Sequence, residues 1–161
     1  MRGFIRGNGL VRVAVSVVLV LLAFAAKPSR GAEPSLAIGG YDPVAYFTQG
    51  RATKGDPNYE YVWDDTRYRF VSARDRDLFT ARPEQYAPQF PGYCAMSLAS
   101  GVKVEPNPEY WLIKDGKLYL FGKSIGPRKF SANFGENVAR ANENWRRGQN
   151  GEAPAATDQA E

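Results

Sequence analysis

The sequence YEYVWDDTRYRFVSARDRDLFTARPEQY, which spans residues 59–86, decides the fold of this chain. In it, aromatic residues alternate with other residue types on both sides of the polar segment 64–66. Such period-two alternation predicts a hairpin of two strands with one face buried. Ser72 follows as the expected N-cap of a short helix in which Leu78 and Phe79 point toward the core.

Helices are also predicted before and after this unit. Asp42 is a suitable N-cap and Pro43 a favourable first helical residue, so a short helix is expected to end near Gly50. The apolar segment 93–101 predicts another short helix that ends at a glycine. From Gly126 onward, apolar residues recur every three to four positions, which predicts a longer C-terminal helix.

A second hairpin is predicted by an Asp-Gly dipeptide at 115–116, which separates alternating runs at 110–114 and 117–121. Asp-Gly in this setting is among the strongest local signals for a hairpin. The expected fold class is therefore α+β: a small antiparallel sheet of about four strands, built from two hairpins and covered by short helices and a C-terminal helix. We expect this single domain at 39–147.

The N-terminal segment has the pattern of a targeting sequence. Basic residues precede the apolar run 13–26 and small residues follow it, as in a secretory signal peptide. The run has 14 residues, fewer than the roughly 20 that a membrane-spanning helix needs. We therefore predict a signal peptide at 1–26, a polar linker at 27–38 and a disordered tail at 148–161. An uncleaved N-terminal anchor is the alternative to the signal peptide.

The charge is distributed unevenly along the chain. The whole chain has 21 basic and 17 acidic residues, with a formal net charge of +4. Five of the basic residues and none of the acidic ones precede Glu33, which leaves 16 basic and 17 acidic residues from there on. The expected mature domain thus has no excess of positive charge with which to bind nucleic acid.

The histidine and cysteine contents limit the chemistry of the chain. There is no histidine, which removes the commonest general base and the commonest metal ligand. Cys94 is the only cysteine, so no disulfide can form within the chain. The fold must therefore be stabilised by its core, to which aromatic residues, 13% of the chain, contribute large buried areas.

Two motifs of the chain resemble those of the YHS domain family. Metal-associated members of that family begin with Asp-Pro-Val-Cys, and the chain has Asp-Pro-Val-Ala at 42–45. Those members continue with aromatic-x-Phe-Cys-Ser-x-x-Cys, and the chain has YRFVSARD at 68–75. Phe79, Pro83 and Tyr86 then follow at the spacing of the family. The framework of the motif is kept, and its cysteines are replaced.

The longer pattern is similar to that of the exported, stand-alone YHS proteins of Gram-negative bacteria. The likeness covers residues 39–145 and includes GYDPVAYF, GYCA and a tryptophan in the C-terminal helix. It implies a periplasmic protein in which Ala45, Val71 and Asp75 stand where the family's metal site has cysteines. Alanine and valine cannot bind a metal, so we expect that site to be lost and its space to be filled by packed side chains.

Cys94 and Met96 are the candidate metal ligands of this chain. Thiolate and thioether sulfur suit Cu(I), so the pair would fit an exported protein that handles copper or another soft metal. However, residues two positions apart on a helix face different directions, and free cysteine is among the most buried residue types. The alternative is that both side chains belong to the core. Cys94 also lacks a histidine to activate it as a nucleophile.

Two pairs of acidic residues, Asp64 with Asp65 and Asp75 with Asp77, have two interpretations. Paired carboxylates can bind a hard cation or act in acid–base chemistry. The first pair also fits a turn, and the second fits the N-terminal end of a helix, where the dipole favours negative charge. We expect the structural interpretation for both pairs.

The chain has more aromatic side chains than a small core must hold. Some would line a shallow pocket for a planar ligand, with Arg67 or Arg69 supplying charge. Alternatively they form the core and its rim, where amphipathic rings are often half-buried. The rings concerned are Tyr41, Tyr46, Tyr59, Tyr61, Trp63, Tyr68, Tyr86, Tyr93, Tyr110, Trp111 and Tyr119.

The functional expectation is a non-catalytic binding or accessory module in the periplasm. Its partner would be an unidentified small ligand or a protein, with no cofactor, no nucleic acid and no membrane span in the mature form. The first alternative is soft-metal handling through Cys94 and Met96. The second is a small enzyme that uses tyrosine, arginine or carboxylate chemistry.

Overall fold

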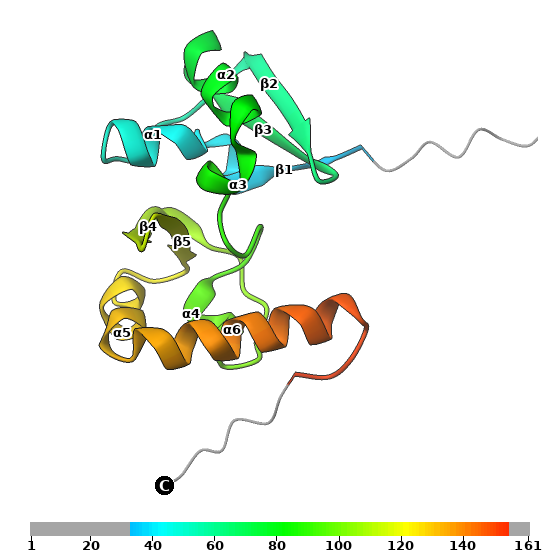
Figure 1. Ribbon diagram of the computed structural model, residues 1–161, viewed down its shortest axis with the longest axis vertical. Helices are drawn as coiled ribbons and strands as arrows, with labels where there is room; N and C mark the ends of the chain where they lie inside the picture. Colours follow the sequence, from blue (N-terminus) through cyan, green and yellow to red (C-terminus); the bar gives the residue numbers. More distant parts are fainter. Residues whose placement is uncertain (1–32, 155–161) are drawn as a thin grey trace, which may run out of the picture. The chain divides into compact units, whose positions relative to one another are not determined.

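The computed structural model of the chain describes residues 33–154 (Figure 1). Within this range the chain forms helices and two small β-sheets, which confirms the predicted α+β class. The predicted signal peptide at 1–26, much of the predicted linker and the end of the predicted tail lie outside the described residues. None of the helices at 33–154 is both long and apolar enough to cross a membrane.

The N-terminal half contains the first predicted hairpin and the two helices predicted next to it. The helix after Asp42 begins at Pro43, and the helix after Ser72 begins at Ala73, as the capping residues predict. The elements in order are β1 (Ser35–Leu36), the 3₁₀ helix η1 (Ala37–Gly40), α1 (Pro43–Thr48), β2 (Asp56–Trp63), β3 (Thr66–Phe70), α2 (Ala73–Ala81) and α3 (Pro83–Tyr86).

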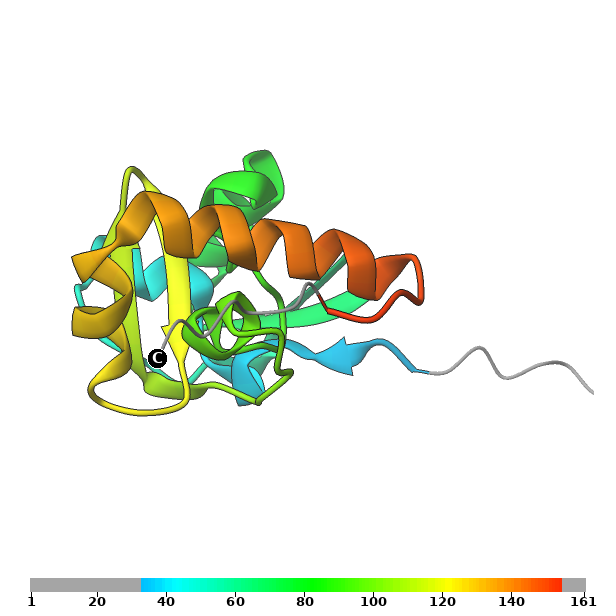
Figure 2. The ribbon, with the colours of Figure 1, turned by 90° about the horizontal axis from the view of Figure 1, so that it is seen from below.

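The C-terminal half contains the second hairpin and three helices, of which α6 lies against α4 (Figure 2). The single long helix predicted from Gly126 is wrong, because Asn133, with φ −126° and ψ 55°, divides it in two. The final helix ends two residues beyond the predicted domain boundary at Arg147. The elements are α4 (Ala95–Ala99), β4 (Asn107–Lys114), β5 (Lys117–Phe121), α5 (Gly126–Ala132) and α6 (Phe134–Gln149).

Both hairpins have two-residue turns in which both central residues have positive φ. Asp64 and Asp65 have φ of 49° and 53°, and Asp115 and Gly116 have φ of 53° and 70°. Turns of this kind match the right-handed twist of the strands and favour Asp, Asn and Gly. The interpretation of Asp64 and Asp65 as turn residues is therefore confirmed.

The two hairpins lie in separate sheets, whereas the sequence predicted one sheet of about four strands. The first sheet has the order β1-β3-β2, with Ser35 and Leu36 paired in parallel with Thr66 and Arg67. The short strand β1 lies in the segment predicted to be a linker. The second sheet is the β4–β5 hairpin, whose strand β5 is bridged on its other side by Pro88. Because β3 and β5 each have a partner on both sides, neither can extend the other's sheet.

The β4–β5 hairpin has buried apolar side chains on both faces. Leu118 and Leu120 join a core cluster with Phe79 and other residues of the N-terminal half. Tyr119 and Phe121 point to the opposite face and join a second cluster with side chains of the C-terminal helices. Figure 1 shows the hairpin between the N-terminal elements and helices α4 to α6. The alternation of side chains along a strand thus places this hairpin between two cores.

Leu118→Ala is expected to lower the free energy of unfolding by about 2–5 kcal/mol, because it removes a fully buried side chain and opens a cavity in the core. Leu118 is 0% exposed. The matched control is Val62→Ala on β2, where the side chain is 49% exposed and the expected change is about 0.5 kcal/mol or less. Urea denaturation measures both, and equal losses in the two variants would contradict a hairpin buried on both faces.

Candidate functional site

Asp42 is a fully buried acidic residue at the N-cap of α1. Its Oδ1 accepts hydrogen bonds from the backbone N–H groups of Val44 at 2.7 Å and Ala45 at 3.2 Å. Its Oδ2 accepts a third hydrogen bond from the N–H of Val71 at 2.8 Å, directly after β3. We call this carboxylate and its three N–H groups the Asp42 site. One side chain thereby joins the start of α1 to the end of β3.

The Asp42 site brings together the three positions at which the YHS resemblance implies lost cysteines. Ala45 and Val71 donate their backbone N–H groups to the carboxylate. Asp75 is near enough for its negative charge to raise the pKa of Asp42. Positions far apart in the sequence therefore gather around one carboxylate.

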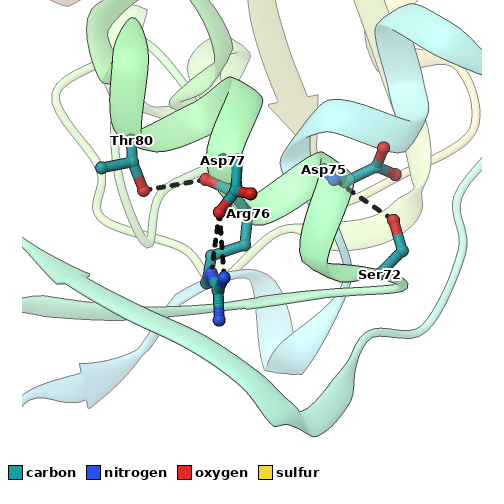
Figure 3. A network of polar contacts seen from close by, with 5 residues as sticks. All are labelled: Ser72, Asp75, Arg76, Asp77 and Thr80. Atoms are coloured by element: carbon teal, nitrogen blue, oxygen red, sulfur yellow. Dashed lines mark hydrogen bonds and ion pairs between the residues drawn. The ribbon is translucent and has the colours of Figure 1, made fainter.

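Asp75 and Asp77 point to different sides of α2 (Figure 3). The Oγ of Ser72 accepts a hydrogen bond from the N–H of Asp75 at 3.2 Å, which confirms the predicted cap. The Asp75 side chain is buried, whereas Asp77 is exposed and forms an ion pair with Arg76 at 2.9 Å. Only Asp75 lies in the first turn of the helix, so the expected helix-end role applies to it and not to Asp77.

The pKa of Asp42 is raised from its ordinary 3.8 to about 6. The main cause is burial, which disfavours the charged form, and the nearby charge of Asp75 adds to the effect. The hydrogen bonds from Val71, Val44 and Ala45 act in the opposite direction, because they stabilise the carboxylate. The effect of burial on the pKa is larger than that of the hydrogen bonds. The site therefore holds a carboxyl group that changes its charge just below neutral pH.

Cys94 and Met96 lie at the start of α4. Cys94 is its N-cap, 4% exposed, and its Sγ accepts a weak hydrogen bond from the N–H of Ser97 at 3.5 Å. Met96 is partly buried and packs against the same core cluster. Among residues 33–154, no group of three or more His, Cys, Asp or Glu side chains is placed to hold a metal ion. Soft-metal binding by this pair stays a prediction.

Several of the singled-out aromatic rings belong to the core. Tyr46, Tyr68, Tyr86 and Tyr119 are buried, and most of the others pack against a core cluster from its rim. Burial raises the pKa of Tyr68 to about 12, and it also raises the pKa of Tyr46 and Tyr119. The Tyr46 hydroxyl donates a hydrogen bond to the carbonyl of Pro108 at 2.9 Å, which ties α1 to β4. These hydroxyl groups therefore stay protonated.

The two arginines expected to supply charge to an aromatic pocket lie outside the cleft and have different environments. The Nε of Arg69 forms a 2.6 Å ion pair with Glu60 across the β2–β3 hairpin. The Nε of Arg67 is buried and has no hydrogen-bond acceptor within the described part of the chain. Neither arginine lines the cleft described next.

A cleft of about 290 Å³ lies where the first hairpin, α3, the start of β5 and α6 meet. Two tryptophans and three charged side chains contribute to its wall. We call it the tryptophan cleft, and its lining consists of Trp63, Asp64, Glu84, Ala87, Pro88, Gln89, Pro91, Lys117 and Trp145.

The sequence did not predict the tryptophan cleft. The sequence places Trp63 among the rings of a possible aromatic pocket, whereas Trp145 enters only through the pattern of the C-terminal helix. Asp64 is a candidate only as part of an acidic pair with Asp65 or as a turn residue, and no sequence pattern distinguishes Glu84 or Lys117. No local signal could have found the set, because its members come from the first hairpin, α3 and the segment after it, β5 and α6, which only the tertiary fold brings together.

Comparisons with models of protein families, with curated proteins and with solved structures found no match. The resemblance to the YHS family therefore rests on the motifs of the sequence and stays a prediction.

Asp42→Ala is expected to lower the free energy of unfolding by about 2–4 kcal/mol at pH 7, because it removes an N-cap and leaves three backbone donors without their acceptor. The control is Ser72→Ala, which removes a cap with one hydrogen bond and is expected to cost about 1 kcal/mol. Chemical denaturation gives both values. A loss in Asp42→Ala no larger than in the control would contradict the bridging role.

The raised pKa of Asp42 predicts a specific dependence of stability on pH. The folded state binds this proton more tightly than the unfolded state, so the part of the stability that comes from the raised pKa is complete below the unfolded pKa of about 3.8 and is lost as the pH rises through about 6. The stability of the wild type relative to Asp42→Asn should therefore fall between pH 4 and pH 7. Urea denaturation across this range measures it. A difference that rises with pH would show that the pKa is lowered instead.

Proposed function

We propose that the chain is a non-catalytic binding module of the YHS type, exported to the periplasm, in which the family's metal site is lost and the Asp42 carboxylate, a kept residue of the motif, holds the scaffold together. The observation that carries the proposal is the set of three hydrogen bonds at the Asp42 site. A metal in such a scaffold would cross-link distant segments through its ligands. Asp42 makes an equivalent link here, between positions 45 and 71, without any thiolate.

The arrangement of polar groups supports binding over catalysis. Among residues 33–154, the groups whose pKa is raised are Asp42 and three tyrosines, all of them buried in the core. None of them lines the tryptophan cleft, whereas catalytic acids and bases are tuned at the place where the substrate sits. The cleft instead offers tryptophan rings and charged side chains at its wall, which suits recognition of a small molecule.

Native mass spectrometry of the full chain, expressed with its N-terminal segment and recovered from the periplasm, tests this function. We expect a processed protein that carries a small organic molecule and no stoichiometric metal. The same measurement on Cys94→Ser distinguishes the proposed function from soft-metal handling. A copper ion that is bound by the wild type and absent from this variant would show that Cys94 binds metal. A chain retained in the cytoplasm, or one recovered with neither a small molecule nor a metal, would contradict the proposal.

A further inference from the structure

The charged side chains of the tryptophan cleft have no ion-pair partner in the part of the chain that the structure describes. Asp64, Glu84 and Lys117 are exposed. Within the described residues, none of the three takes part in an ion pair or a side-chain hydrogen bond. The cleft thus contains two free carboxylates and one free ammonium group, an excess of one negative charge.

The two tryptophans of the cleft pack against other aromatic rings. Trp63 contacts Phe79 with a ring-centroid distance of 6.1 Å, and Trp145 contacts Tyr93 at 5.8 Å. Both indoles remain partly exposed, and both belong to the cleft wall. Aromatic rings fixed by their neighbours give a ligand a rigid surface at little cost in conformational entropy.

This combination favours one class of ligand. The faces of tryptophan rings attract ammonium and guanidinium groups more strongly than those of any other side chain. Unpaired carboxylates beside the rings add charge complementarity, and the same carboxylates repel an anion. The volume of about 290 Å³ is at the lower end of the range for small-molecule sites, so the ligand is expected to be small.

Given the binding function proposed for the chain, we propose that the tryptophan cleft binds a small organic cation. Its ammonium or guanidinium group lies against Trp63 and Trp145, and Asp64 and Glu84 neutralise its charge. Lys117 opposes the binding of such a cation and limits its affinity. The cleft therefore distinguishes an organic cation from a neutral polyol or a dicarboxylate.

NMR of the isotope-labelled protein tests the site directly, because the chain has three tryptophans and one of them is an internal control. Choline and spermidine serve as cationic probes, glucose as a neutral probe and succinate as an anionic one, all at constant ionic strength. We expect choline or spermidine to shift the indole N–H signals of Trp63 and Trp145 in a saturable manner. Trp111, which packs on Tyr46 and does not line the cleft, should not shift.

Charge variants test the roles of the side chains. Asp64→Asn/Glu84→Gln should weaken cation binding by roughly tenfold or more, and Lys117→Gln should strengthen it. Asparagine tolerates the positive φ at position 64, so the turn is kept. The matched control is Asp65→Asn/Glu109→Gln, which removes the same charge outside the cleft and should change binding by about twofold or less.

Three results would overturn the inference in different ways. Shifts caused by glucose or succinate but not by the cations would show that the cleft binds another class of ligand, and the binding function would stand. Equal weakening in the cleft variant and in its control would reduce the effect to general charge attraction. If no probe moves either indole signal and the periplasmic protein carries no small molecule, both this inference and the proposed function fail.

Discussion

The hydrogen bonds to the Asp42 carboxylate are the interaction on which the N-terminal half depends. Two of them start α1, and the third holds the chain where it leaves β3 and enters α2. A fully buried carboxyl group is costly unless such bonds compensate for its lost hydration. The three bonds link the start of α1 to the end of β3 through protein groups alone.

The second constraint is the burial of the β4–β5 hairpin on both faces. Its alternating side chains join two core clusters, so that helices α4 to α6 are tied to the N-terminal half through one pair of strands. The Tyr46 hydroxyl adds a polar link to the carbonyl of Pro108 at the start of β4. The tryptophan cleft lies where elements of both halves meet, and both sets of packed rings fix its wall. Rigidity of the two cores is therefore what gives the cleft a defined shape.

Local signals in the sequence predicted most of the elements and little of their assembly. The caps at Asp42 and Ser72 and the turns at 64–65 and 115–116 act over a few residues, so their chemistry is visible in the chain itself. The pairing of β1 with β3 involves only two residues of β1, which is too short a segment for its sequence to show the alternation of a strand. Period-two alternation also could not tell that β5 is buried on both faces, because aromatic and aliphatic residues alternate there in place of apolar and polar ones. The cleft was missed for the related reason that its residues meet only in the tertiary structure.

The titration of Asp42 itself is the most direct test of the central claim, that a buried, hydrogen-bonded carboxylate joins the start of α1 to the end of β3. NMR can follow its side-chain carboxyl carbon together with the amide protons of Val44, Ala45 and Val71 as the pH is changed. A midpoint near pH 6, shared by the carboxyl carbon and the three amides, is the result expected for this site. A midpoint near the ordinary 3.8, with amide signals that do not follow it, would mean that the carboxylate is solvated and does not bridge α1 and β3.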